Sequence, residues 1–251
     1  MSDHKITAMV TGASAGLGAQ YCRQLAERCE VIIAVARRGE RLAELARELH
    51  GQVEVHAVVA DLTTIEGVAR AMEALRQQGP VDYLVNNAGF STAGEFADQV
   101  IDSQYDMVSL HINATLALCR TAIPFMAELG GGYIINVASI AAFLPGGGMA
   151  VYGASKAFLN HFSTALQAEV AASGIKVQSL CPGHTRTEFH DTAALSGFDK
   201  STVPNELWME ADAVVTASLQ ALATEQVVVV GERSRPVCRK GLQQQLDAME
   251  L

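Results

Sequence analysis

The chain has 251 residues, of which 49% are hydrophobic and 18% are charged, and its formal net charge is −9. This composition is typical of a packed globular protein and is too apolar for a disordered chain, and the length fits one large domain. The acidic balance argues against a general nucleic-acid-binding protein, which would need a basic face.

The sequence gives no sign of a disulfide-stabilised, metal-bound or membrane protein. Its five cysteines are odd in number and contain no C-x-x-C pair, which predicts reduced thiols and no metal site. The N-terminus lacks the apolar region of a secretory signal, and the apolar runs are too short to span a bilayer. We therefore expect a cytoplasmic protein that binds neither membrane nor nucleic acid.

Short apolar runs alternate with longer helix-like segments along the chain. The runs are continuous rather than alternating, which is typical of strands buried on both faces of a parallel sheet. The expected strands are Ile6–Val10, Val31–Val35, Val53–Val59, Tyr83–Val85, Tyr133–Val137, Lys176–Leu180 and Val227–Val230. The expected helices are Leu17–Arg28, Glu40–Leu49, Ile65–Gln77, Ser103–Glu128, Tyr152–Ala172 and Glu210–Ala223, with a kink at Pro124 in the fourth.

This alternation predicts an α/β fold: one Rossmann-type doubly wound domain over residues 1–251, with a seven-stranded parallel sheet flanked by helices. The stretch 184–208 has no clear periodicity and contains Gly197 and Pro204, so we expect a lid there. The charged tail 232–251 is expected either to contact a partner or to fray.

A glycine-rich turn follows the first strand and opens the first helix. Gly12 permits a tight turn, Gly16 lets the backbone approach a pyrophosphate, and Gly18 permits close packing. The spacing is G-x-x-x-G-x-G, and its place at the start of a strand–helix–strand unit predicts a dinucleotide site.

The second strand ends without the acid that would bind the ribose 2′-hydroxyl of NAD, and Arg37 stands there instead. Arginine suits a 2′-phosphate, and Ser14 could add a hydroxyl contact, so the expected cofactor is NADP(H). Alternatively, Arg37 and Arg38 form a solvated helix start.

A serine, a tyrosine and a lysine further along the chain could act together in proton transfer. Tyr152 and Lys156 are four residues apart and face the same way on one helix, so the lysine charge is expected to lower the tyrosine pKa, which is roughly 10 in free tyrosine. Ser139 comes just after a buried strand, and its hydroxyl could bond a substrate oxygen beside Tyr152.

Thr11–Gly18, Asn86–Gly89, Ser139, Tyr152-x-x-x-Lys156 and Pro182-Gly183 occur in this order, and the chain from Ile6 to Gly231 resembles the compact branch of the short-chain dehydrogenase/reductase family. The resemblance implies that Ser139, Tyr152, Lys156 and Asn113 are catalytic, with Asn113 helping to hold a water that relays protons from Lys156. It implies that Asn86 braces the sheet. It also implies a cofactor site formed by Gly12, Ser14, Gly16, Leu17, Gly18, Arg37, Asp61, Leu62, Asn87, Ala88, Gly89, Tyr152, Lys156, Pro182, Gly183, Thr185 and Thr187. Position 185 is commonly aliphatic in the family, and Thr185 departs from that pattern.

Apolar side chains flank the catalytic set and predict a neutral, fairly apolar ketone, aldehyde or secondary alcohol as substrate. The expected pocket residues are Phe90, Ala141, Phe143, Met149, His184 and Phe189. One alternative is a 3-oxoacyl thioester reductase acting on carrier-bound substrates, which would need a basic docking patch such as Arg186, Lys200, Arg235, Arg239 and Lys240. Others are an extended-branch enzyme such as a sugar-nucleotide epimerase, although the chain lacks its substrate domain, and a non-enzymatic NADP(H) sensor. The resemblance further implies a homodimer or homotetramer formed through the helices 103–128 and 152–172.

Overall fold

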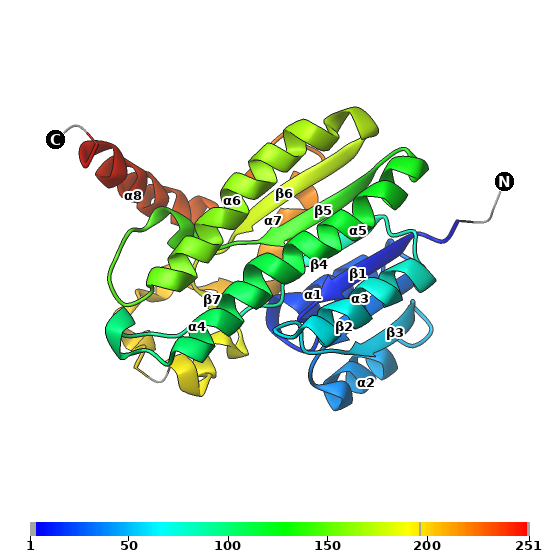
Figure 1. The fold of residues 1–251 in the computed structure, drawn as a ribbon, viewed down its shortest axis with the longest axis horizontal. Helices are drawn as coiled ribbons and strands as arrows, with labels where there is room; N and C mark the ends of the chain where they lie inside the picture. Colours follow the sequence, from blue (N-terminus) through cyan, green and yellow to red (C-terminus); the bar gives the residue numbers. More distant parts are fainter. Residues whose placement is uncertain (1–3, 196, 250–251) are drawn as a thin grey trace.

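The computed structural model describes residues 4–195 and 197–249. Seven parallel strands form one sheet in the order β3-β2-β1-β4-β5-β6-β9 (Figure 1). They are β1 (Thr7–Thr11), β2 (Val31–Ala36), β3 (Glu54–Val59), β4 (Tyr83–Asn86), β5 (Gly132–Val137), β6 (Ile175–Cys181) and β9 (Val228–Val230). The strand order reverses between β1 and β4, and ligands of open α/β sheets bind at such a switch point. The predicted doubly wound sheet is confirmed.

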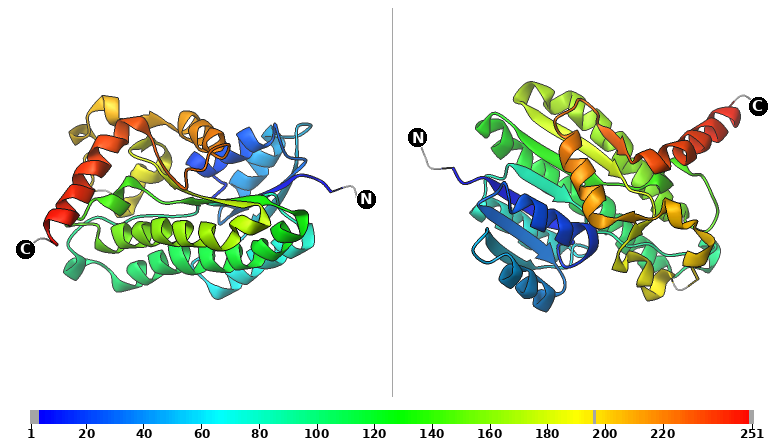
Figure 2. Two further views of the ribbon diagram at one scale, coloured as in Figure 1. Left: turned by 90° about the horizontal axis from the view of Figure 1, so that it is seen from above. Right: turned by 180° about the vertical axis from the view of Figure 1, so that it is seen from behind.

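Two apolar layers cover the sheet (Figure 2). Helices α1 (Gly16–Leu25), α2 (Gly39–Glu48) and α7 (Ala211–Ala221) supply one layer, with Tyr21, Leu42 and Val215 fully buried. Helices α3 (Ile65–Gln78), α5 (Ala114–Leu129) and α6 (Ala150–Val170) supply the other. The central strands β1 and β2 are buried along their whole length, as their continuous apolar runs predict.

Strand β3 departs from the expected burial. Every residue of β3 is exposed or half-buried, because the strand lies at the edge of the sheet and has one neighbour, β2. An apolar run alone does not distinguish an edge strand from a central one.

The helix expected over 103–128 is divided. Helix α4 (Ile101–Val108) is followed by a π-helical turn, Ser109–Asn113, and then by α5. Pro124 lies inside α5. A π-helical turn holds more residues than an α-helical turn and therefore changes which side chains face the sheet, and such turns are frequent at functional sites.

The lid and the tail both pack on the body of the protein. The two ends of the lid are held together by a two-stranded parallel ladder, in which β7 (Thr185–Arg186) pairs with β8 (Met209–Glu210). The tail forms helix α8 (Arg235–Asp247), which projects from the body in Figure 1. The helix packs on the segment 140–143, where Gly241 approaches the Phe143 carbonyl and Gln245 Nε2 donates to that oxygen at 3.1 Å.

All five cysteines are free and buried, as expected for reduced thiols. Among the described residues, no helix has the length and apolar character needed to cross a membrane.

Candidate active site

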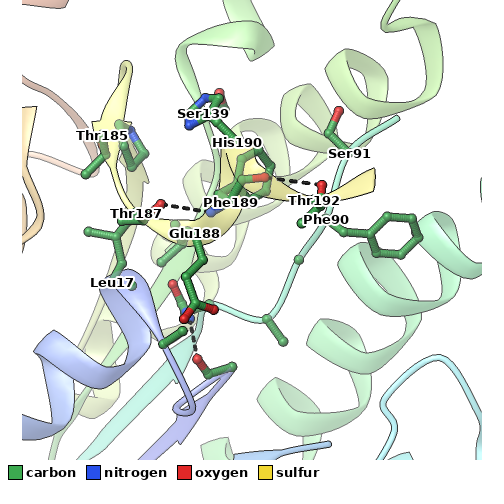
Figure 3. Close-up of a pocket in the computed structure, with 18 of the residues that line it drawn as sticks. Leu17, Phe90, Ser91, Ser139, Thr185, Thr187, Glu188, Phe189, His190 and Thr192 are labelled. Atoms are coloured by element: carbon green, nitrogen blue, oxygen red, sulfur yellow. Dashed lines mark hydrogen bonds between the residues drawn. The ribbon is translucent and has the colours of Figure 1, made fainter. Parts of the chain in front are cut away.

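A cavity of about 840 Å³ runs along the carboxyl ends of the strands. It is lined by the β1–α1 turn, the ends of β2 to β6 and the lid. Figure 3 shows Leu17 and Glu188 near one end and Ser139, Phe189 and His190 near the other. We call these the turn end and the substrate end of the cavity.

The glycine turn has the geometry of a nucleotide cradle. Gly12 and Gly16 have φ angles of +67° and +53°, a backbone conformation that residues with a side chain rarely adopt. A Cβ on Gly18 would lie 2.2 Å from the Gly12 carbonyl oxygen, so Gly18 lies beneath the turn, where a side chain would not fit. Ala15, at the N-cap of α1, offers no side-chain cap for the first amides of the helix. These amides suit a pyrophosphate, so the turn fits the dinucleotide that the sequence predicts.

The end of β4 is tied to this turn. The backbone N–H groups of Asn87 and Ala88 donate to Thr11 Oγ1 at 2.9 and 3.0 Å, and Asn87 Nδ2 donates to the Thr11 carbonyl at 2.8 Å. Asn86 instead donates from Nδ2 to Asn136 Oδ1 at 2.8 Å, inside the sheet. Asn86 therefore braces β4 against β5, as expected, while Asn87 faces the cavity.

Two arginines stand at the turn end. Arg38 donates from Nε and Nη2 to Ser14 Oγ at 3.2 and 3.1 Å, and its Nη1 lies 2.9 Å from Glu188 of the lid. Arg37 has a side chain that is 70% exposed and lies 3.8 Å from Asp61. The sequence prediction favoured Arg37 beside Ser14, but it is Arg38 that contacts Ser14 in the structure.

Ser139, Tyr152 and Lys156 line the same cavity. The Lys156 side chain is buried, and its Nζ donates to the Val137 carbonyl at 2.8 Å, at the end of β5. The same Nζ lies 5.7 Å from the centre of the Tyr152 ring. Two elements thus position the set. The last residue of β5 is the partner of Lys156 and Ser139 follows two residues later, while the first turns of α6 supply Tyr152 and Lys156.

Burial governs the pKa values of this set. Burial raises the pKa of Tyr152 above its usual value, and the Ser139 hydroxyl lowers it by less. Burial lowers the pKa of Lys156 to about 7. We expected Lys156 to lower the tyrosine pKa, but among the protein's own groups burial outweighs any such effect.

The prediction for Asn113 is wrong. Asn113 is exposed and does not line the cavity. The buried polar side chain of the π-helical turn is His111, whose Nε2 and the Lys156 Nζ both approach Gly89. Helical spacing does not reveal a π-helical turn, so the sequence alone does not distinguish His111 from Asn113 as the buried residue. The neighbouring histidine, with apolar residues on both sides, was the signal that could have found it.

All the predicted cofactor residues except Gly18, which lies beneath the turn, line the cavity. The cavity is lined by Gly12, Ser14, Gly16, Leu17, Arg37, Asp61, Leu62, Asn87, Ala88, Gly89, Tyr152, Lys156, Pro182, Gly183, Thr185 and Thr187. Thr187 contacts the glycine turn, since a Cβ on Gly16 would lie 3.2 Å from its side chain.

The substrate end is apolar and aromatic. Phe90, Ala141, Met149, His184 and Phe189 line it as predicted, and the further lining residues are Ser91, Ile140, Leu144, His190, Thr192, Leu195 and Phe198. The prediction that Phe143 lines the pocket is wrong. Phe143 does not line the cavity but packs against the buried cluster of Ala138, Leu159 and Cys181. The reason is the 3₁₀ turn Ile140–Phe143, which directs Ala141 and Phe143 to different surroundings.

The His184 ring stacks on Phe198, and His190 meets Trp208 edge-on. Burial lowers the pKa of both histidines, so both are mostly neutral near pH 7. The lid cations are paired: Arg186 with Glu210 at 3.1 Å, and Lys200 with Asp191. These ion pairs weaken the case for a basic carrier-docking patch at the cavity mouth.

Known proteins are similar to this chain in sequence and in fold. The short chain dehydrogenase family profile matches residues 6–195. An uncharacterized oxidoreductase of Staphylococcus epidermidis is 33% identical over 214 residues, covering 85% of this chain and 90% of that protein.

Two solved structures are also similar to this chain. A short-chain dehydrogenase from Sphingobium yanoikuyae in complex with NADPH has a TM-score of 0.83 and 34% identity, covering 97% of this chain and 95% of that one. A bulky-bulky ketone specific alcohol dehydrogenase from Comamonas testosteroni has a TM-score of 0.79 and 32% identity, covering 95% and 94%.

The fold and the site define a Rossmann-type oxidoreductase. The chain belongs to the short-chain dehydrogenase/reductase family, and it is a dehydrogenase/reductase enzyme.

Proposed function

We propose that this enzyme is an NADP(H)-dependent oxidoreductase that interconverts a neutral, fairly apolar ketone or aldehyde and its alcohol. The observation that carries the proposal is the shared cavity: the glycine turn lies at one end, Ser139, Tyr152 and Lys156 lie within it, and apolar and aromatic side chains form the other end. Retention of both Tyr152 and Lys156 argues against a non-enzymatic sensor.

The residues divide the chemistry in a simple way. The nicotinamide, when bound, supplies a hydride to the carbonyl carbon or accepts one from the alcohol. In reduction, the Tyr152 hydroxyl gives its proton to the carbonyl oxygen, and the Ser139 hydroxyl hydrogen-bonds the same oxygen. The Lys156 ammonium stabilises the phenolate that remains, because opposite charges attract strongly in a buried site. In oxidation, the same phenolate takes the alcohol proton.

Arg38 carries the proposed preference for NADP(H). Its guanidinium already bonds Ser14 beside the glycine turn, where the ribose of the adenosine half would lie. A planar guanidinium binds two phosphate oxygens at once, which favours a 2′-phosphate over a hydroxyl. Arg37 is the more exposed of the two and contributes a weaker, screened attraction.

The substrate class rests on the lining of the substrate end. The side chains described at this end are mostly apolar and include Asp191, and His184 and His190 are neutral near pH 7, so none of them carries a fixed positive charge for a carboxylate-rich substrate. The similarity to a ketone-specific alcohol dehydrogenase supports the same class.

A second copy of the chain is the proposed partner. The α4–α5 segment exposes apolar side chains, among them Ile101, Tyr105 and Leu116. Exposed apolar groups that lie along one helical segment are typical of a subunit interface. We propose a homodimer or homotetramer formed through this segment and α6.

Tyr152→Phe should lower kcat for ketone reduction on the order of 10²- to 10⁴-fold, because the proton donor is lost. NADPH binding, followed by cofactor fluorescence, should persist in the variant. In the wild type, oxidation needs the phenolate, so its rate should rise between pH 7 and 9, because the Tyr152 pKa is raised and lies above that range. The rise should be less than tenfold per pH unit, because Lys156, whose pKa burial lowers to about 7, loses its stabilising charge over the same range. Reduction needs the phenol and should stay nearly flat there. An oxidation rate independent of pH would contradict this role of Tyr152.

Arg38→Leu should weaken NADPH binding about 10- to 100-fold and leave NADH binding within about threefold, because a charge-assisted hydrogen bond to phosphate is lost. Arg37→Leu is the matched comparison and should weaken NADPH binding by less than about fivefold. Dissociation constants from fluorescence titration measure both effects. A larger loss of NADPH affinity in Arg37→Leu than in Arg38→Leu would show that Arg37, and not Arg38, binds the 2′-phosphate.

Light scattering should give the wild type a mass of two or four chains. Leu116→Glu should lower that mass, because a charge at an apolar interface loses its hydration on assembly. Ile65→Glu is the control, since Ile65 is an exposed apolar residue at the start of α3, outside the proposed interface. A monomeric wild type, or an unchanged mass in Leu116→Glu, would count against the interface.

A further inference from the structure

His111 is a buried titratable group with no part in the chemistry above. It lies in the π-helical turn between α4 and α5, and its side chain is 1% exposed. A buried histidine is stable when both ring nitrogens have hydrogen-bond partners. The partners of His111 belong to two different walls of the active site.

The first partner is the catalytic helix. His111 Nδ1 lies 2.8 Å from Ser155 Oγ, and Ser155 Oγ donates to the Tyr152 carbonyl oxygen at 2.8 Å. The second partner is the loop after β4, where the Phe90 N–H donates to His111 Nε2 at 3.2 Å. Phe90 lines the substrate end of the cavity, and Ser155 stands between Tyr152 and Lys156 in the sequence.

These contacts fix one tautomer. Because the Phe90 N–H donates to Nε2, that nitrogen carries a lone pair and no proton. The one hydroxyl proton of Ser155 is used on the Tyr152 carbonyl, so Ser155 Oγ must accept from Nδ1–H. His111 is therefore neutral, with its proton on Nδ1, and each of the three donors in this series of hydrogen bonds has an acceptor.

The surroundings disfavour a second proton. An imidazolium would direct an Nε2–H at the Phe90 N–H, donor against donor. Lys156 is the nearby cation: a Cβ on Gly89 would lie 2.9 Å from His111 Nε2 and 3.6 Å from Lys156 Nζ. Burial, and to a lesser extent the Lys156 charge, hold the pKa of His111 well below its usual value.

The other titratable groups nearby do not reverse this. Tyr152 meets the His111 ring edge-on, with the ring centres 5.9 Å apart, and it is neutral below its raised pKa. Residues 87–91 and the rest of the π-helical turn hold no titratable side chain. Asp102, Tyr105 and Asp106 of α4 are exposed.

We propose that His111 is a positioning residue that stays neutral across the working pH range and joins the Phe90 wall of the substrate pocket to the helix that carries Tyr152 and Lys156. It acts through its partners: Nε2 holds the Phe90 backbone, and Nδ1–H holds Ser155 and, through it, the Tyr152 backbone. The chain of hydrogen bonds ends at a backbone carbonyl, so this arm of His111 does not deliver a proton to the Tyr152 hydroxyl. The inference deepens the proposed function and rests on it.

Two substitutions test the two hydrogen bonds of His111 separately. Asn has its amide at the place of Nδ1, so His111→Asn keeps a donor for Ser155 and leaves the Phe90 N–H without its acceptor. Gln reaches the place of Nε2, so His111→Gln keeps an acceptor for the Phe90 N–H and leaves Ser155 without its donor. We expect His111→Asn to raise KM for the ketone about tenfold with kcat little changed, and His111→Gln to lower kcat about tenfold with KM little changed. His111→Ala should do both.

His50→Asn is the control, because His50 is an exposed histidine just past the end of α2. It should leave kcat, KM and the melting temperature unchanged. If the His111 variants lower the melting temperature but leave kcat and KM as in the wild type, or if Asn and Gln have the same kinetic effect, the positioning role is overturned.

Imidazole ¹⁵N NMR of the full-length protein tests the tautomer without turnover. The resonances that disappear in His111→Asn should show a protonated Nδ1 and an unprotonated Nε2 that do not titrate between pH 6 and 9. Protonated Nε2, or titration in that range, would overturn the inference. If the wild type turned over no carbonyl substrate, the proposed function would fail while this spectrum still tested His111.

Discussion

The active site depends on one buried contact, the hydrogen bond from Lys156 Nζ to the Val137 carbonyl at 2.8 Å. Burial disfavours the charged form of Lys156 and lowers its pKa to about 7, and the hydrogen bond to Val137 offsets part of that cost. This contact joins α6 to the end of β5, so it fixes Tyr152 and Ser139 relative to each other. Further polar contacts support the same joint: Asn136 Nδ2 donates to Ser163 at 3.0 Å, and Ser179 donates to Asn160. The helix that carries the catalytic pair is thereby held in register with the sheet.

The sheet and most of the site could be predicted from the sequence for the same reason. Parallel strands buried on both faces leave continuous apolar runs, as in Val31–Ala36, where every residue is buried. Because the carboxyl ends of parallel strands meet at one edge, motifs that follow successive strands converge, whatever their separation in the chain. Gly12, Asn87, Ser139 and Gly183 come after four different strands and line one cavity.

What the sequence did not reveal depends on local geometry. A π-helical turn shifts the buried face, so His111 points at the active site and Asn113 at solvent. The 3₁₀ turn after Ser139 directs Phe143 into the core. Arg37 and Arg38 are adjacent at the end of β2, and spacing does not decide which one reaches Ser14. Burial and edge position, which need the assembled fold, set the Tyr152 pKa and the exposure of β3.

We infer that one cavity binds NADP(H) at the glycine turn and places a carbonyl compound against Tyr152. The most direct test is to titrate the wild-type protein with NADPH and with NADH by cofactor fluorescence, and then to add a panel of apolar ketones and aldehydes. We expect tighter binding of NADPH than of NADH, followed by loss of NADPH fluorescence when a substrate is reduced. Failure of both cofactors to bind would contradict it, and the glycine turn would then be a structural feature alone.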